Sequence, residues 1–261
     1  MKYIGILCVL LAISLPVCAD DWTAVESAPV AGIPAESWKH LVTHFREKPY
    51  SVDELRPCLE VVANAAGEGL PVETILTRIE EGVAKQVGAT ALEQSVRQRL
   101  DSLRRAKVVL EQAGTKESIT GRQRELIPVV ASALESQVTV AGLRRAVEHG
   151  SSLRLCRLKT AISTGESLKL MGLDDETVAS FMDDFVTRRL CCGETLRAAR
   201  LVGEQHRAGV GGPKIRELLW GRGTGGTLAP RWQRRRGHES SDDDTDDTTS
   251  PGRGRGPRGR S

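Results

Sequence analysis

Three stretches of the sequence open in the same way, and each opening leads into apolar residues with helical spacing. They are "GIPAESW" from Gly32, "GLPVETI" from Gly69 and "GLDDETV" from Gly172. A glycine at this place suits the left-handed conformation that ends a preceding helix or turn. The apolar residues that follow recur at intervals of three and four, which indicates one buried stripe on each helix. The openings therefore predict three amphipathic helices.

Each position of this opening has a structural role. With Pro71 as the N-cap, Leu70 and Ile75 have the spacing at which two apolar side chains staple the chain to the first turn of a helix. The same spacing holds around Pro34 and around Asp174. A glutamate then falls in each first turn, where its charge meets the positive end of the helix dipole. We interpret the repeated opening as a way of starting a helix and not as a repeated binding site.

The rest of the patterning also predicts helices. Aromatic residues make up 3% of the chain, and Ala, Leu, Val, Glu and Arg are abundant, which favours helices over strands. Ser51 and Glu54 form a capping box, and Pro128 is expected to kink or start its helix. Further helices are predicted at about residues 52–66, 89–114, 122–149, 151–171 and 193–208.

The spacing of the three openings predicts how these helices are arranged. They are separated by 37 and 103 residues, close to one and three times a helical-hairpin repeat of about 34 to 37 residues. We expect an all-α fold built as an array of antiparallel helical hairpins, with a true solenoid as the stronger form of this prediction. Gly82 lies inside a helix at a cost of about 1 kcal/mol relative to alanine, so another side chain is expected to pack closely against it.

The segment "GLPVETILTRIEEGVAKQVGA" resembles a family of uncharacterised exported helical proteins of bacteria. These proteins show Gly-Leu-Pro, then Glu-Gly, an Ala-Lys pair and another glycine before a second helix. The resemblance runs from Gly69 to about Leu110 and extends more loosely to the later half around Gly172. This chain has Gln86 where the pattern has glycine. The resemblance implies export and a helical fold, and it implies no activity.

The first nineteen residues are predicted to be a secretory signal peptide. Lys2 precedes an apolar run that is too short to span a bilayer as a mature helix. Val17 and Ala19 place small residues at the positions that signal peptidase recognises, so cleavage is expected after Ala19. The alternative is a lipoprotein with a lipidated Cys18, for which Val17 is larger than the usual preceding residue. We expect an exported protein, periplasmic or secreted, with no transmembrane span in the mature chain.

After residues 1–19, the sequence predicts three further regions. Residues 20–34 are expected to be an extended segment. Residues 35–220 are expected to form the helical domain, with possible halves at 35–114 and 122–220, and residues 221–261 a disordered tail rich in Gly, Arg and Asp.

Four cysteines follow the signal peptide, and an exported compartment is usually oxidising. We expect Cys191 or Cys192 to join Cys58 or Cys156, because the adjacent pair cannot bond to each other without strain. The alternative is that all four are small buried hydrophobic residues.

One pair of histidines has metal-ligand spacing. His40 and His44 stand four residues apart on one helical face, but the glutamate of a zinc-protease helix and a nearby third ligand are missing. The default interpretation is two half-exposed histidines. The sequence also lacks a GxSxG or HExxH motif, and "GRGTGG" from Gly221 follows a helix where a dinucleotide fingerprint needs a strand. We therefore expect no enzymatic activity and no cofactor.

The tail is the one region with a polyanion-binding composition. Arginines spaced by glycine can follow a polyanion, and a tryptophan beside them offers a stacking surface. After export, an anionic envelope glycan or lipid headgroups would be within reach, although the acidic block "DDDTDD" could instead fold back on the arginines. The candidate residues are Arg231, Trp232, Arg234, Arg235, Arg236, Arg253, Arg255, Arg258 and Arg260.

The formal net charge of +3 indicates no particular partner. Our leading hypothesis is an exported, non-enzymatic helical interaction or scaffold protein of the cell envelope, with an unknown protein partner. The alternative is a small-molecule or metal carrier that uses a cleft between helices.

Overall fold

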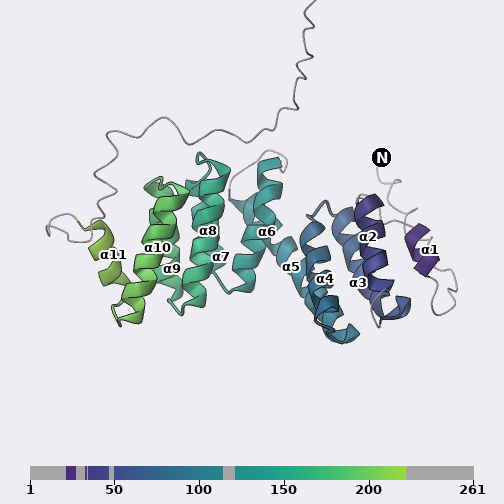
Figure 1. Ribbon diagram of the computed structural model, residues 1–261. Helices are drawn as coiled ribbons and strands as arrows, with labels where there is room; N and C mark the ends of the chain where they lie inside the picture. Colours follow the sequence, from purple (N-terminus) through teal and green to yellow (C-terminus); the bar gives the residue numbers. More distant parts are fainter. Residues whose placement is uncertain (1–21, 28–32, 34, 47–49, 114–120, 222–261) are drawn as a thin grey trace, which may run out of the picture. The chain divides into compact units, whose positions relative to one another are not determined.

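The computed structural model describes residues 22–27, 33, 35–46, 50–113 and 121–221 (Figure 1). These residues form eleven helices and no strand, so the all-α prediction is confirmed for them. The helices are α1 (Trp22–Ser27), α2 (Ala35–Arg46), α3 (Val52–Gly67), α4 (Glu73–Ala84), α5 (Ala89–Gln112), α6 (Gly121–Glu135), α7 (Val140–His149), α8 (Leu155–Leu170), α9 (Asp175–Thr187), α10 (Cys192–Arg207) and α11 (Gly212–Trp220).

The chain divides into two compact units. The first runs to Gly212 and contains α1 to α10, and the second begins at Pro213, where the described residues belong to α11. In the described part of the chain, no helix is both long enough and apolar enough to cross a bilayer.

Helices of the first unit pack mainly against their near neighbours in the sequence. The larger contacts join helices that are one or two apart in chain order, such as α5 with α6, α7 with α9, and α8 with α10. Such a pattern is typical of stacked helical arrays. The finer arrangement as antiparallel hairpins stays a prediction.

A single type of turn ends six of the described helices. In each turn a residue with positive φ follows the helix, and an apolar residue comes next. At the end of α3, for example, the Gly69 N–H donates to the Ala66 carbonyl at 3.0 Å and the Leu70 N–H donates to the Ala65 carbonyl at 2.9 Å. This pair of bonds defines a Schellman motif, which satisfies carbonyls at the helix end. The six residues are Gly69, Gln86, Gln137, Gly172, Arg189 and Gly209.

The predicted left-handed conformation is therefore confirmed at Gly69, with φ of 69°, and at Gly172, with φ of 91°. Gly32 lies outside the described residues. Three of the six turns use a side-chain-bearing residue instead, and Gln86, at φ of 55°, is one of them.

We expect Gln86→Gly to stabilise the protein by about 0.5–1 kcal/mol, because glycine has no Cβ to crowd the left-handed conformation. The Gln86 side chain is exposed, so its removal costs little packing. Urea unfolding would show the gain as a higher midpoint. Gly69→Ala is the matched control and should lower the midpoint; an unchanged midpoint in both variants would contradict the assignment of these turns.

The predicted helix caps are confirmed in two cases and wrong in one. The Ser51 hydroxyl accepts from the Glu54 N–H at 3.3 Å while the Glu54 carboxylate accepts from the Ser51 N–H at 2.8 Å, which is the expected capping box. Asp174 caps α9 and accepts from the Thr177 N–H at 2.8 Å. Pro71 does not cap α4, because Val72 occupies the N-cap position there.

Two predicted segments are corrected. Residues 122–149 form two helices and not one, because Gln137 adopts a φ of 63° and ends the first with a Schellman turn. Residues 20–34 were expected to be extended, but they contain α1. Trp22 in α1 is buried against Phe45, with ring centroids 6.4 Å apart. This apolar contact stabilises the folded segment.

The first unit contains an internal repeat with an offset of 103 residues. Helix α3 runs from Val52 to Gly67, and α8 runs from Leu155 to Leu170, so both bounds are shifted by 103. The positive-φ residues Gly69 and Gln86 have the same relation to Gly172 and Arg189. Buried residues of α4 correspond in the same way to buried residues of α9: Ile75 to Val178, Ile79 to Met182 and Val83 to Val186.

Gly82 confirms the prediction of close packing inside α4. A Cβ atom placed there would clash with Leu92 Cδ1, so α4 and α5 approach each other closely at this glycine.

Candidate functional site

A cluster of charged side chains lies where α4, α5 and α6 meet. Glu135, at the end of α6, pairs with two arginines: its Oε1 lies 3.1 Å from Arg99 Nη1 and its Oε2 lies 3.0 Å from Arg78 Nη2. The Arg99 side chain is 8% exposed and that of Glu135 is 18% exposed. Arg99 also donates to the Ser132 hydroxyl at 3.3 Å and to the Pro128 carbonyl at 3.5 Å.

The second half of the internal repeat has apolar residues at the two described positions that correspond to the arginines of the cluster. Phe181 stands where the first half has Arg78, and Val202 stands where it has Arg99. Both apolar residues are fully buried. The two arginine positions of the cluster are therefore apolar in the second half, and the position that corresponds to Glu135, residue 238, lies outside the described residues.

A charged cluster of this kind is not the most stable filling for a helix junction. Removing charges from water costs several kcal/mol per ion, and apolar residues of similar volume are often at least as stabilising. Departures from the locally stable choice are expected at functional sites. We therefore take the junction and its surroundings as the candidate site.

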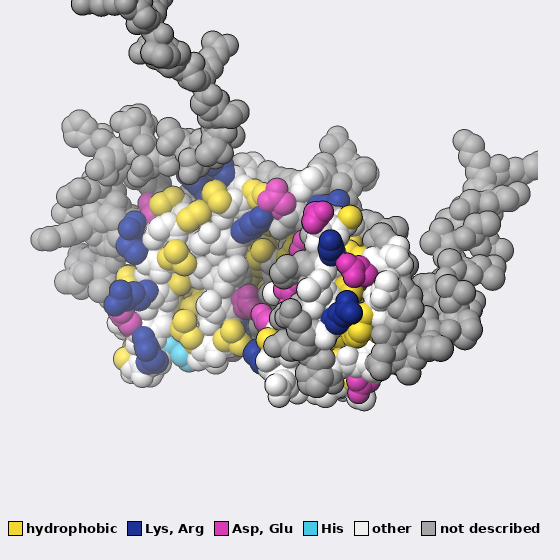
Figure 2. Space-filling view, turned by 45° about the vertical axis from the view of Figure 1, so that its right-hand side comes forward, with side chains coloured by type: hydrophobic (Ala, Val, Ile, Leu, Met, Phe, Trp, Pro, Cys, Tyr) yellow, Lys and Arg dark blue, Asp and Glu magenta, His cyan; other side chains and the backbone are white. Residues whose placement is uncertain are grey.

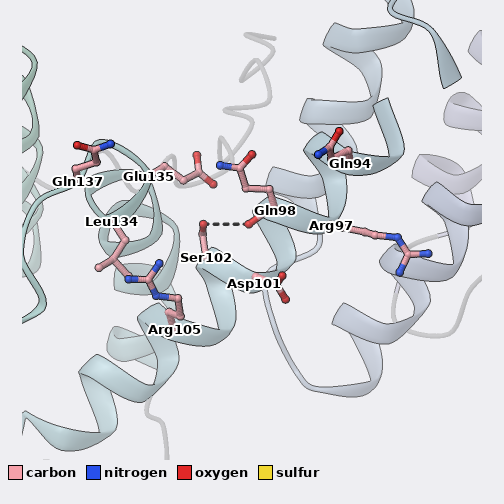
Figure 3. A pocket seen from close by; sticks show the side chains of 9 residues that line it. All are labelled: Gln94, Arg97, Gln98, Asp101, Ser102, Arg105, Leu134, Glu135 and Gln137. Carbon is pink, nitrogen blue, oxygen red and sulfur yellow. Dashed lines mark hydrogen bonds between the residues drawn. The ribbon is translucent and has the colours of Figure 1, made fainter. Parts of the chain in front are cut away.

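A polar cleft opens beside Glu135, between α5 and the turn from α6 to α7 (Figure 3). Its volume is about 540 Å³. Six of its residues come from α5 at helical spacing and form one stripe along that helix. The lining residues are Gln94, Arg97, Gln98, Asp101, Ser102, Arg105, Leu134, Glu135 and Gln137.

Figure 3 shows how the side chains are distributed in the cleft. Gln98 from α5 and Glu135 from α6 extend toward each other, and Arg97 points away from them. Arg97 pairs with Glu93 on its own helix at 2.8 Å. The Ser102 hydroxyl donates to the backbone carbonyl of Gln98 at 3.0 Å, which orients the hydroxyl along the helix.

A smaller hollow of about 300 Å³ shares Glu135 with this cleft. It lies between α4 and the α5–α6 junction, and Arg78, Arg99 and Ser132 also line it, with Thr74, Thr77 and Glu81. Glu135 thus lines both polar hollows, and each of its carboxylate oxygens pairs with one arginine.

The chemistry of the cleft favours binding by hydrogen bonds. Three primary amides, two guanidinium groups, two carboxylates and a hydroxyl line it. A nucleophile next to a general base, which covalent catalysis requires, is not found among these lining residues. A primary amide offers two donors and one acceptor, so a row of glutamines can pair with groups that both donate and accept.

The two histidines predicted as possible metal ligands lie on the same helix. His40 and His44 both lie in α2, but their side chains are outside the described residues. In the described portion of the chain, no three His, Cys, Asp or Glu side chains converge as metal ligands. The tail arginines and Trp232, like the signal peptide and Cys18, are also outside the described residues.

The four described cysteines fall into different surroundings, and all are free thiols. Cys58 is fully buried in α3, as the alternative interpretation expected, and burial raises the pKa of its thiol to about 11. Cys156 is exposed, and Cys191 and Cys192 are half-buried. Burial and the neighbouring Cys192 raise the pKa of the Cys156 thiol, whereas the pKa of Cys58 responds to burial and to the charges of Glu93 and Arg97.

The cleft and the charged cluster were not predicted from the sequence, although one signal was present. Arg99 lies within the apolar stripe of its helix, between Val96 and Leu103, where a leucine or valine is expected. Gln94 and Gln98 stand four residues apart, which places their amides on one face. The partner Glu135 is 36 residues away from Arg99, and no local pattern connects them.

Comparisons with known proteins yield no match: no family model fits the chain, and no curated protein or solved structure is significantly similar to it.

Proposed function

We propose that this protein is an exported, non-catalytic helical scaffold that binds an extended segment of a partner protein in the polar cleft along α5. The observation that carries the proposal is the stripe of hydrogen-bonding side chains on α5, which faces a cleft of about 540 Å³. Helices present such side chains more rigidly than loops do.

An extended polypeptide fits the cleft chemically. Its backbone presents one N–H donor and one C=O acceptor per residue, and the amides of Gln94, Gln98 and Gln137 can pair with both. Arg105 and Asp101 supply one charge of each sign. On the face in Figure 2, both basic and acidic side chains are present. This mixture favours recognition of a partner by local hydrogen bonds over long-range attraction of an oppositely charged partner.

The rival proposal is a carrier of small polar molecules that uses the same cleft. Its volume is within the range of ordinary ligand sites, although these are mostly lined by apolar side chains. The described lining contains one apolar residue, Leu134. Because ordinary small-molecule sites are mostly apolar, this polar lining favours a polypeptide over a small molecule.

The proposals on export and on the tail rest on sequence alone. Export is supported by the composition of residues 1–19, and contact with envelope glycans or lipid headgroups is supported by the arginine and glycine spacing of residues 221–261.

A peptide-display library screened against the full chain tests the proposed function. We expect recovered peptides to lose about tenfold in affinity with Gln98→Ala, which corresponds to one or two lost hydrogen bonds. Gln205→Ala is the matched control, because it removes the same side chain from α10, away from the cleft lining. Affinities would be measured by isothermal titration calorimetry.

Two results would contradict the proposal. One is a library that yields no specific binder, and the other is a set of peptides whose affinity falls equally with both variants. A panel of small polar molecules that raises the melting temperature in wild type but not in Gln98→Ala would support the carrier instead.

A further inference from the structure

Two cysteines from different helices meet at one edge of the first unit. Cys156 is the second residue of α8 and Cys192 is the first residue of α10, and these two helices pack against each other. Burial and the neighbouring Cys192 thiol both raise the pKa of the Cys156 thiol, so the two thiols lie close enough to influence each other. The two residues are 36 positions apart in the sequence, so the packing of the helices brings their thiols together.

The two thiols are also reachable from solvent. Cys156 is exposed and Cys192 is half-buried, whereas Cys58 is fully buried. Cys191 is the direct neighbour of Cys192 in the turn before α10, where its N–H donates to the Glu194 carboxylate at 2.8 Å. The thiol that influences Cys156 is that of Cys192.

The fold itself does not require this pair. By the 103-residue offset, Asp53 stands in the first half where the second half has Cys156, and Ala89 stands where it has Cys192. The same helix starts are thus built without sulfur in the first half. Both cysteines therefore occur in the second half of the repeat and have no counterpart in the first half.

We propose that Cys156 and Cys192 form a disulfide that joins the beginnings of α8 and α10. The two thiols exchange with a small-molecule or protein disulfide: one thiolate attacks the oxidant and displaces a thiol, and the other then attacks the mixed disulfide. One S–S bond forms in the protein and one is lost from the oxidant. The oxidant takes up the two electrons and the two protons and leaves as two thiols.

The surroundings determine how the reaction depends on pH. Burial and the contact with Cys192 raise the pKa of the Cys156 thiol, and the charge of Arg157 opposes this shift. Since the thiolate is the attacking species, bond formation should speed up as pH rises through the alkaline range. The resulting bond would close a loop that contains α9.

The test uses the folded full chain incubated with oxidised glutathione and then digested with trypsin without reduction. The sequence predicts that Cys156 is released in a peptide of residues 155–157 and Cys192 in a peptide of residues 190–197. We expect these two peptides to be linked by a bond that a reductant breaks. Closure of a loop of this size should raise the melting temperature of the oxidised protein by about 5–10 °C.

Because Cys191 lies in the same peptide as Cys192, two variants identify the bonded thiol. Cys192→Ala should abolish the link and the gain in melting temperature, while Cys191→Ala, the matched control, should retain both. The proposal is overturned by a link that survives in Cys192→Ala and disappears in Cys191→Ala. Glutathione adducts on Cys156 without a linked peptide would also overturn it.

Discussion

Replacing Glu135 with alanine is expected to destabilise the protein by about 3–5 kcal/mol, because it leaves a buried charge without its partner. Arg99 is 7% exposed and would lose the carboxylate that lies 3.1 Å from its Nη1. Its remaining acceptors are the Ser132 hydroxyl and the Pro128 carbonyl, which are neutral. Urea unfolding followed by circular dichroism would measure the change.

Two further variants identify the cause of this loss. Arg78→Ala removes the other partner of Glu135. Because the Arg78 side chain is 41% exposed, this variant should lower the free energy of unfolding by about 1 kcal/mol or less. The double variant Arg99→Met with Glu135→Leu should have a free energy of unfolding within about 1 kcal/mol of wild type, because both charges are removed together. A double variant as unstable as Glu135→Ala would show that the loss comes from packing and not from the unpaired charge.

Phe181→Ala is expected to cost about 3–5 kcal/mol, the usual cost of emptying a buried aromatic site. Phe181 is fully buried, and its ring stacks on Phe185 with centroids 6.1 Å apart. Its removal leaves a cavity beside Phe185 and Met182, which are also buried.

The internal repeat supplies a control for this experiment. Phe181 corresponds to Arg78, so Phe181→Ala and Arg78→Ala truncate side chains at equivalent positions of the two halves. We expect a difference of at least about 2 kcal/mol between them. Equal losses would contradict the assignment of a buried apolar environment to position 181 and of a partly exposed polar one to position 78.

Much of the fold could be predicted from local sequence patterns. Spacings of three and four between apolar residues indicated the helices, and Val52–Gly67 and Ala89–Gln112 lie within a few residues of their predicted bounds. Gly69 and Gly172 were predicted at left-handed positions and occupy them. These predictions succeed because periodicity and backbone conformation depend on residues close together in the chain.

Local patterns were less informative where an unusual residue occupies a turn. Gln137 ends α6 in a left-handed conformation that glycine or asparagine usually adopts. The apolar periodicity continues across it, so residues 122–149 resembled one helix. The tertiary packing of α6 and α7 against other helices supports the break.

The candidate site depended on contacts that the sequence order does not reveal. Glu135 meets Arg78 and Arg99 across separations of 57 and 36 residues. Cys192 lies near Cys156 rather than Cys58, a choice that the sequence left open. Each of these pairs forms because two helices pack at a particular register.

The sequence by itself thus determined the all-α class, most helix starts and the glycine turns, because these follow from interactions within one or two helical turns. Only the tertiary structure decided which side chains share Glu135, which face of α5 borders a cleft and which two thiols lie near each other. The physical reason is that helices are amphipathic over a broad face. Many registers bury the same apolar stripe, and the packing of α4, α5, α6, α8 and α10 selects one of them.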